Sequence, residues 1–209
     1  MNRFLFLPLC FALITDAYAQ GTVLFYNHVP TIGLDAPVFD VGGQNFLAGY
    51  PFFAQLYAGP AASSLTPIGF PLVFQTGPGA GHWTAGFDGG YARIITTVAP
   101  GDTAFVQVRA FSVVTGQNYE DVLARGGRHG ESLVFSVITG GDTKNGTQPP
   151  SLPAYLTGLQ SFSLTGVDPV PAAPEPTTTA LLLTGGLIAG VLRYRSRRRE
   201  TARPVRGQR

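Results

Sequence analysis

The chain has 209 residues, of which only 12 % are charged, and it contains 27 glycines and 17 prolines. Its formal net charge of +2 hides an uneven distribution, because eight arginines follow residue 192, whereas residues 20–173 hold five basic and nine acidic residues. This acidic balance excludes a body that binds nucleic acid through a basic surface. The only cysteine is Cys10, so residues 20–173 offer neither a disulfide nor a thiolate ligand or nucleophile.

Residues 1–19 have the three parts of a secretory signal peptide. Arg3 supplies the positive charge, about eleven apolar residues follow it, and Ala17 and Ala19 form a small-x-small cleavage pattern before Gln20. The apolar run is shorter than the roughly 20 residues that a membrane-spanning helix needs. We therefore expect export of the chain and cleavage by signal peptidase between Ala19 and Gln20.

From residue 20 to residue 165, short apolar runs alternate with clusters of Gly, Pro, Asn and Asp, a pattern typical of many short strands. We expect strands at residues 22–26, 37–41, 51–57, 67–74, 91–98, 103–112, 131–139 and 159–164. Prolines within 67–74 predict an edge strand or an irregular segment there. The pattern predicts a mainly β fold, namely a single antiparallel β-sandwich, jelly-roll-like or immunoglobulin-like, and leaves the strand order open.

The two clearest strands are residues 91–98 and 103–112. The segment between them, residues 99–102 (APGD), has turn chemistry, so we expect an antiparallel hairpin. In the second strand small aliphatic residues alternate with larger and partly polar ones. This alternation predicts that the aliphatic face packs in the core and that the other face is partly covered.

Residues 118–125 (NYEDVLAR) form the one stretch of the body that predicts a helix. Asn118 can cap its N-terminus, Glu120 and Asp121 favour that end of the helix dipole, and two glycines follow Arg125. We therefore expect one short helix within the β-rich body.

Few residues of the body suggest catalysis or metal binding. The histidines, His28, His82 and His129, are far apart in the sequence and show no metal-binding spacing, so we expect neither a metal nor a cofactor. No G-x-S-x-G motif supports a nucleophilic serine. The paired carboxylates of a glycoside hydrolase remain an open alternative, although Asp35 and Asp40 lie in stretches where aspartate usually serves turn formation.

Aromatic residues make up 11 % of the chain and allow two interpretations. Most of them are expected to fill the core, but some could form a platform on which sugar rings stack. Trp83, the only tryptophan, lies in the glycine-rich segment 76–90 beside His82. It is the best single candidate for an exposed ligand contact.

The C-terminal region begins with residues 166–173, a proline-rich stretch that predicts a short linker. Residues 177–192 are an apolar run that would form a helix about 24 Å long, a thin but feasible transmembrane helix. By the positive-inside rule, the arginines after it place that end in the cytoplasm. The first five of these arginines are Arg193, Arg195, Arg197, Arg198 and Arg199. Together with the signal peptide, they predict a single-pass precursor in the inner membrane with its body in the periplasm.

Pro174, Glu175 and Pro176 directly precede the apolar run. A Pro-Glu-Pro tripeptide, a short apolar helix and an arginine-rich end, in this order at the C-terminus of an exported chain, resemble the PEP-CTERM sorting signal, here residues 174–209. That family comes from Gram-negative bacteria that make extracellular polysaccharide. The resemblance implies that a membrane-embedded processing enzyme, an exosortase, recognises the tripeptide and that the body is then released or attached at the cell surface.

These features predict a non-enzymatic protein of the cell surface or extracellular matrix, with a structural or interaction role. A carbohydrate-binding module for exopolysaccharide is the first alternative, and a secreted glycan hydrolase is the second. The resemblance to the PEP-CTERM family implies a destination and a processing partner, and it implies no activity for the body.

Overall fold

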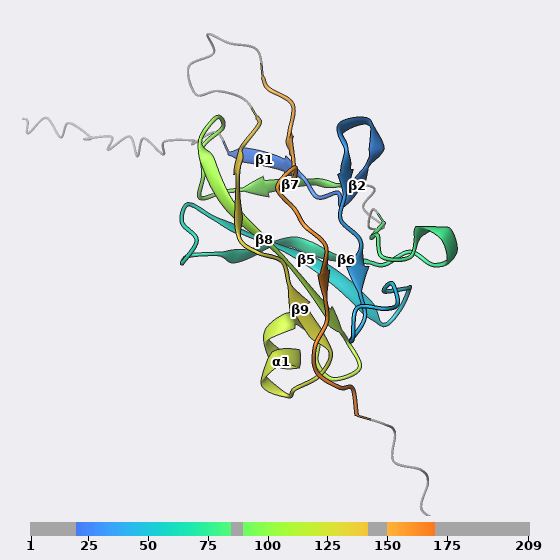
Figure 1. Cartoon of the computed structure of the whole chain (residues 1–209). Helices are drawn as coiled ribbons and strands as arrows, with labels where there is room; N and C mark the ends of the chain where they lie inside the picture. Colours follow the sequence, from blue (N-terminus) through green and yellow to red (C-terminus); the bar gives the residue numbers. More distant parts are fainter. Residues whose placement is uncertain (1–19, 85–89, 142–149, 170–209) are drawn as a thin grey trace, which may run out of the picture. The chain divides into compact units, whose positions relative to one another are not determined.

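Figure 1 shows the computed structural model, which describes residues 20–84, 90–141 and 150–169. This part of the chain is mainly β, with one short α-helix and several sheets, as the sequence predicts. The strands are β1 (Gly21–Leu24), β2 (His28–Val29), β3 (Leu34–Asp35), β4 (Val38–Phe39), β5 (Phe52–Gly59), β6 (Thr66–Val73), β7 (Ala92–Ile95), β8 (Thr103–Ser112), β9 (His129–Glu131), β10 (Phe135–Ile138), β11 (Ala154–Tyr155) and β12 (Phe162–Ser163). The helix is α1 (Tyr119–Ala124), and two 3₁₀ turns are η1 (Pro30–Ile32) and η2 (Gly77–Gly79).

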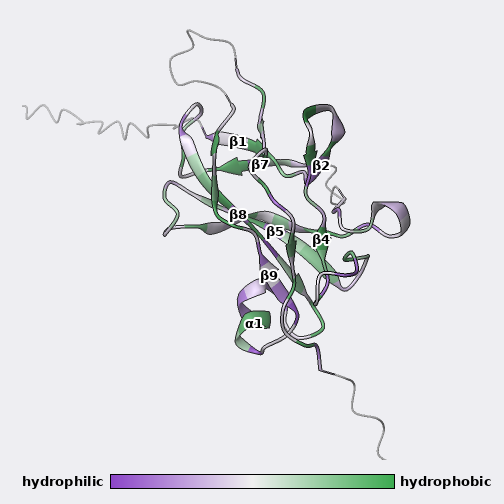
Figure 2. Ribbon diagram, in the orientation of Figure 1, coloured by the Kyte–Doolittle hydropathy of each residue, from purple (hydrophilic) through white to green (hydrophobic). Residues whose placement is uncertain are grey.

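The larger sheet has the strand order β10-β8-β5-β6, and β9 pairs with a second stretch of β8. β8 is central because it pairs with β5 over eight residue pairs and also with β9 and β10. The small aliphatic face expected for residues 103–112 is confirmed, since its four residues have no exposed surface. These residues are Ala104, Val106, Val108 and Ala110. Figure 2 shows the hydrophobic residues along β5 and β8.

β6 forms the edge of this sheet, as the prolines in residues 67–74 predict. Pro67 and Pro71 have no N–H to donate, which suits an edge strand. Gly69 adopts a φ of +64°, close to where the register with β5 shifts between Ala54 and Leu56. Prolines and an irregular register both discourage another chain from pairing with an open edge.

The smaller sheet has the order β11-β1-β7, and two further two-stranded sheets pair β4 with β12 and β2 with β3. β1 pairs antiparallel with β7 but parallel with β11, and β4 pairs parallel with β12. The expectation of a wholly antiparallel body is therefore wrong for these two pairs. Parallel partners need a long connection, and here the last described segment of the chain returns to lie along the first strands.

The expected hairpin between residues 91–98 and 103–112 is also wrong, because β7 pairs with β1 and β8 belongs to the larger sheet. The turn between them carries the chain from one sheet to the other. Thr139 holds this turn: its backbone oxygen accepts the Gly101 N–H at 2.9 Å, and its Oγ1 donates to Ala99 O at 2.7 Å. Turn chemistry predicts a change of direction but not the strand that β7 pairs with.

The strand expected at residues 131–139 is shortened to β10, and its first residue, Glu131, ends a separate strand, β9; both strands pair with β8. Ser132 lies at the break: its Oγ accepts the Val108 N–H at 3.0 Å, and its own N–H donates to Val108 O at 2.8 Å. Farther along, β11 lies in a stretch that was expected to contain no strand. The strand expected at residues 159–164 is shortened to β12.

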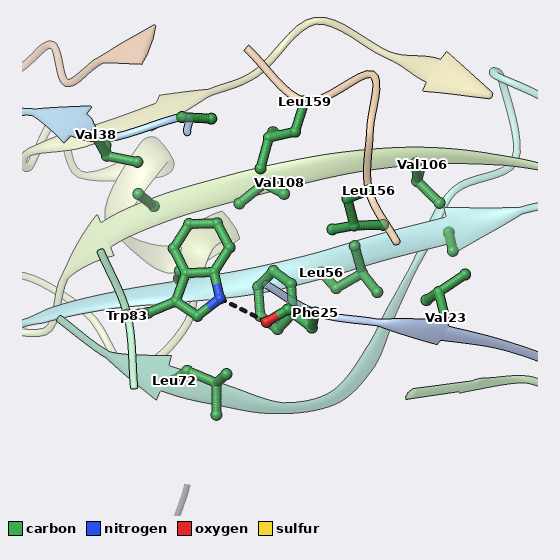
Figure 3. Packing of buried hydrophobic residues seen from close by; sticks show 14 of the residues in the cluster. Val23, Phe25, Val38, Leu56, Leu72, Trp83, Val106, Val108, Leu156 and Leu159 are labelled. Carbon is green, nitrogen blue, oxygen red and sulfur yellow. Dashed lines mark hydrogen bonds between the residues drawn. The ribbon is translucent and has the colours of Figure 1, made fainter. Parts of the chain in front are cut away.

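Residues of both sheets share one hydrophobic cluster. Val23 and Ile95 come from the smaller sheet, and Leu56 and Val108 come from the larger one; all four have no exposed surface. Figure 3 shows the side chains of this cluster gathered between the strands. Burying this apolar surface stabilises a cysteine-free body in place of disulfides.

The helix expected at residues 118–125 is confirmed as α1. The side chain of Asn118 caps it by accepting the Asp121 N–H at 2.8 Å. α1 packs against β8 and β9, so the expectation that this face of β8 is partly covered is also confirmed. The residues buried beneath it are Tyr57, Phe111, Tyr119 and Val122.

The folded body extends beyond residue 165. The carboxylate of Asp168 accepts hydrogen bonds from Ser112 Oγ at 2.8 Å and from Thr115 Oγ1 at 3.0 Å. The segment expected as a linker, residues 166–173, therefore includes at least one residue that is fixed to the body.

No helix of residues 20–84, 90–141 or 150–169 is long and apolar enough to cross a membrane. The predicted signal peptide (residues 1–19) and the predicted sorting signal (residues 174–209) lie outside these ranges. Both stay predictions from the sequence.

Candidate functional site

The surface of the described body carries three clusters of ion-paired side chains. We name each after one residue. The Arg109 cluster comprises Arg109, Glu120 and Glu131 with the hydroxyls of Tyr57 and Tyr119; the Arg128 cluster comprises Arg128, Asp40 and Asp168; the His28 cluster comprises His28, Asp35 and His82. They differ in whether a permanently charged arginine is paired with their carboxylates.

Trp83, the residue expected to contact a ligand, is part of the core instead. Only 2 % of its surface is exposed, and its indole N–H donates to Phe25 O at 2.7 Å, as Figure 3 shows. Its ring lies 4.7 Å from that of Phe25 and 6.0 Å from that of Phe74, measured between centroids. A bridge between Phe74 and Trp83 brings the glycine-rich segment back onto the end of β6. The prediction of an exposed contact is therefore wrong.

In the Arg109 cluster, the arginine side chain forms ion pairs with both carboxylates. The guanidinium of Arg109 lies 4.0 Å from the ring centroid of Tyr57 and 4.9 Å from that of Tyr119. Its Nη1 is 3.2 Å from Glu120 Oε1, and its Nε is 3.6 Å from Glu131 Oε2. Both carboxylates therefore share one guanidinium partner, and the arrangement ties α1 and β9 to β8.

The tyrosine hydroxyls of this cluster remain protonated at neutral pH. Burial, followed by the hydrogen bond to Glu120, raises the pKa of Tyr57 far above its ordinary value. Burial and the nearby charge of Glu131 raise the pKa of Tyr119 to about 12. The two hydroxyls act as donors, to Glu120 at 2.8 Å and to Glu131 at 3.2 Å.

A pocket of about 310 Å³ lies beside α1. Its polar lining includes Gln55, Tyr57, Gln117, Tyr119 and Glu120. Amide, hydroxyl and carboxylate groups that converge in one concave site can fix the orientation of a small polar ligand.

In the Arg128 cluster, too, the arginine side chain forms ion pairs with both carboxylates. Arg128 donates from Nη1 to Asp40 at 3.0 Å and from Nε to Asp168 at 2.7 Å, while its guanidinium lies 4.6 Å from the ring centroid of Phe52. Burial raises the pKa of Asp168, but the hydrogen bonds from Ser112, Arg128 and Thr115 outweigh it and hold the pKa below its ordinary value. The pair Asp40 and Asp168 lines a pocket of about 330 Å³.

This pair of carboxylates fits poorly with glycoside hydrolysis. A hydrolase of that type needs one carboxyl group with a raised pKa to donate a proton to the leaving group. The pKa of Asp168 is lowered instead, and Arg128 lies between the two carboxylates. Asp168 is therefore unsuited to be the proton donor, and its hydrogen bonds with Arg128, Ser112 and Thr115 tie the end of the described body to the rest.

The His28 cluster begins in the β2–β3 hairpin. His28 and Asp35 are paired across its two strands, with η1 and Gly33 between them. Gly33 has a φ of +71°, a conformation that favours glycine, and its N–H donates to Pro30 O. This short turn places His28 Nδ1 at 3.1 Å from Asp35 Oδ1.

His82 reaches the same carboxylate from a distant part of the chain. It follows η2, and its Nε2 lies 2.9 Å from Asp35 Oδ1. The rings of His28 and His82 lie 4.6 Å apart between centroids. Two imidazole nitrogens therefore converge on one carboxylate oxygen.

The buried side chain of Asn27 fixes the backbone next to all three members. Its Nδ2 donates to Ala36 O at 3.0 Å and to Gly81 O at 2.9 Å, and its Oδ1 accepts the Trp83 N–H at 3.3 Å. Asn27 itself precedes His28, Ala36 follows Asp35, and the other two residues flank His82. One amide thus connects the segments that carry the cluster.

The cluster is anionic at its centre and open to solvent. Hydrogen bonds from His28 and then from His82 lower the pKa of Asp35, so the carboxylate is ionised at neutral pH. The side chains of Asp35, His28 and His82 are 62 %, 46 % and 16 % exposed. Each offers one ligand atom, all within 4.8 Å of one another, so the three residues could hold a cation together.

No spacing in the sequence points to this cluster. The three histidines are far apart along the chain, yet His28 and His82 lie together in the structure, whereas His129 hydrogen-bonds Gly127 O at 2.7 Å near α1. In Figure 1, α1 and the β2 hairpin lie at opposite ends of the body. The proline and glycine between His28 and Asp35 could have predicted their pairing, whereas no local pattern points to His82.

No protein family, curated protein or solved structure matches this chain. The assignment of a role to these clusters therefore depends on their geometry and chemistry.

Proposed function

We propose that this protein is exported, held for a time in the inner membrane by its C-terminal region, and then placed at the cell surface or in the extracellular matrix. There it has a structural or interaction role and no enzymatic one. The observation that carries this proposal is the order Pro174-Glu175-Pro176, apolar run 177–192 and arginine-rich end, in a chain that also starts with a signal-peptide pattern. The processing partner is an exosortase-type enzyme.

The body suits such a role. It contains no cysteine after Cys10, so its stability does not depend on the redox state of its surroundings. Its edge strand β6 carries two prolines that oppose edge-to-edge association. The carboxylates of the Arg109 and Arg128 clusters are paired with arginine, which supports a structural use of these charges over a catalytic one.

We also propose that the larger and smaller sheets pack as the two layers of a sandwich, with a transmembrane helix at residues 177–192 of the precursor. The shared hydrophobic cluster supports the two layers, since Val23 and Ile95 of one sheet belong to the same cluster as Leu56 and Val108 of the other.

Replacement of Pro174, Glu175 and Pro176 by alanine tests this function in a Gram-negative host that makes an exosortase. We expect the wild-type protein to lose its C-terminal region and to leave the membrane fraction, whereas the variant stays uncut and membrane-bound. Intact mass and fractionation measure both outcomes. In the matched control, Pro169 and Pro171 are replaced by alanine, and processing should continue. Equal release of the wild type and the triple variant would contradict the proposal.

A second candidate function is binding of exopolysaccharide, favoured by the pocket beside α1, whose lining combines aromatic rings with amide and carboxylate groups. Gln117 is an exposed member of its lining and is absent from the Arg109 ion pairs, so Gln117→Ala can weaken a glycan contact without breaking the cluster. Gln44→Ala, in an exposed loop outside the pocket lining, is the matched control. Glycan binding that Gln117→Ala and Gln44→Ala leave equally intact would contradict this site.

A further inference from the structure

The His28 cluster differs from the other two charged clusters in having a carboxylate without a permanent cation. Among the described residues, Asp35 forms its ion pairs with His28 and His82 and with no lysine or arginine. Both contacts end on the same oxygen, Oδ1, at 3.1 and 2.9 Å. The two rings therefore direct nitrogen atoms towards one small region beside a negative charge.

The chemistry of these donors selects a class of cation. Two imidazole nitrogens and one carboxylate oxygen suit Zn²⁺, Cu²⁺ and Ni²⁺, whereas Mg²⁺ and Ca²⁺ prefer sites made of oxygen atoms alone. Thiolates are excluded from the described body, because Cys10 is the only cysteine of the chain.

From this geometry we propose that His28, Asp35 and His82 bind a divalent transition-metal ion, with the three side chains as its protein ligands. The inference goes beyond the proposed function and is independent of it, because it concerns only residues of the folded body.

The distances in the cluster are close to those that a metal ion requires. At metal–ligand distances of roughly 2.0–2.1 Å, two ligand atoms of a tetrahedral site lie about 3.3 Å apart. The two contacts of Asp35 Oδ1, at 3.1 and 2.9 Å, already match this separation to within a few tenths of an ångström. All three ligand atoms lie within 4.8 Å of one another, so bringing the two ring nitrogens into one coordination sphere requires a movement of about an ångström or two.

The backbone beneath the cluster is suited to hold such a site. Asn27 is 1 % exposed and directly precedes His28. Its side chain hydrogen-bonds Ala36, the neighbour of Asp35, and also Gly81 and Trp83, the two neighbours of His82. Ligands fixed by a rigid support lose little freedom when a metal binds, which favours affinity.

Exposure of the cluster leaves part of the coordination sphere accessible. Asp35 and His28 are 62 % and 46 % exposed, so a bound ion would keep at least one position for water or for an oxygen or nitrogen donor of another molecule. A metal here can therefore connect this body to a second molecule that supplies the remaining ligand.

Titration of the metal-free full chain with Zn²⁺ alone tests the proposal. The protein is purified without a histidine tag, and binding is followed by calorimetry and by the melting temperature. We expect one bound Zn²⁺ per chain and a rise in the melting temperature, whereas Ca²⁺ produces neither. His28→Gln and His82→Gln should each weaken the binding of Zn²⁺ about tenfold or more, because even the loss of a residue that only hydrogen-bonds a ligand weakens metal binding by about 10–100-fold. Substituting Co²⁺ should give the visible absorption of a nitrogen- and oxygen-ligated ion.

His129→Gln is the matched control, because it removes a histidine outside the cluster and should leave Zn²⁺ affinity unchanged. Of the two histidine ligands, His82 is the more buried. If His82→Gln lowers the melting temperature of the metal-free chain, the more exposed His28→Gln decides the result. Absence of saturable Zn²⁺ binding by the wild type, or equal affinity of the wild type and His28→Gln, would overturn the proposal.

Discussion

The Arg128 cluster and the His28 cluster both join distant segments of the chain through carboxylates, but they do so differently. In the Arg128 cluster a guanidinium lies between Asp40 and Asp168, and the side chain of Asp168 is only 10 % exposed. In the His28 cluster the carboxylate of Asp35 is 62 % exposed and has two imidazoles as partners. In the first cluster each carboxylate is paired with the guanidinium, whereas the second cluster leaves an anion and two nitrogen ligands available.

The position of the stabilising residues differs as well. In the Arg128 cluster the charged side chains themselves are partly buried and connect β4, β9 and the C-terminal end of the body. At the His28 cluster, by contrast, uncharged residues beneath it provide the stability, namely Asn27 and Trp83, which are 1 % and 2 % exposed. Replacing a charged residue of the Arg128 cluster should therefore lower the free energy of unfolding. Replacing the carboxylate of the His28 cluster should leave it almost unchanged.

The largest loss of stability is expected when Trp83, which lies beneath the His28 cluster, is replaced. Trp83→Ala should lower the free energy of unfolding by about 3–5 kcal/mol, because it opens a cavity in the core and leaves Phe25 O without its donor. Urea denaturation measures the change. Trp83→Phe keeps most of the ring and should cost less. A loss under about 1 kcal/mol for Trp83→Ala would mean that the ring is exposed, as the sequence suggested.

Removal of a carboxylate from the Arg128 cluster should have the next largest effect. Asp168→Ala should lower the free energy of unfolding by about 3 kcal/mol, since it leaves Arg128, Ser112 and Thr115 without their shared acceptor. Urea denaturation is again the measurement. Asp102→Ala, on an exposed turn, is the control and should have little effect. Equal stability of the two variants would remove the contrast between the clusters.

Acid should weaken the same cluster. The pKa of Asp168 in the folded body lies below its ordinary value of 3.8, so ionisation of this group favours the folded state at neutral pH. That stabilisation is present above the ordinary pKa and is lost as the pH falls through the lowered one. Asp168→Asn should therefore flatten the decline of the free energy of unfolding in acid. A decline of identical steepness in the wild type and Asp168→Asn would contradict the assignment.

The smallest effect is expected from the carboxylate of the His28 cluster. Without metal, Asp35→Asn should change the free energy of unfolding by less than about 0.5 kcal/mol, because exposed ion pairs contribute little. Thermal unfolding with and without Zn²⁺ measures this. In Zn²⁺ the wild type should gain stability and Asp35→Asn should gain much less. A large loss without metal would mean that Asp35 is a structural residue like Asp168.

Patterns that depend on neighbouring residues could be predicted from the sequence. The alternation in β8 correctly placed Ala104 and Val108 in the core, and Asn118 with the glycines after Arg125 correctly bounded α1. The prolines of β6 correctly predicted an edge strand. In each case the physical cause acts within a few residues of the chain.

Features that depend on distant residues could not be predicted. β7 has a turn after it that suits a hairpin, yet it pairs with β1, because the choice of partner depends on burial of both sheets. Trp83 lies in a glycine-rich segment that suggests exposure, yet its hydrogen bond to Phe25 places it in the core. His28 and His82 are 54 positions apart, and the hydrogen bonds of Asn27 that join their segments leave no local trace in the sequence.

Anomalous X-ray scattering from crystals grown with Zn²⁺ tests the contrast between the two clusters most directly. This contrast predicts a zinc peak between His28 Nδ1, His82 Nε2 and Asp35, and none between Asp40 and Asp168, where Arg128 already supplies a positive charge. A zinc peak at the Arg128 cluster, or occupied zinc sites with none at the His28 cluster, would contradict it.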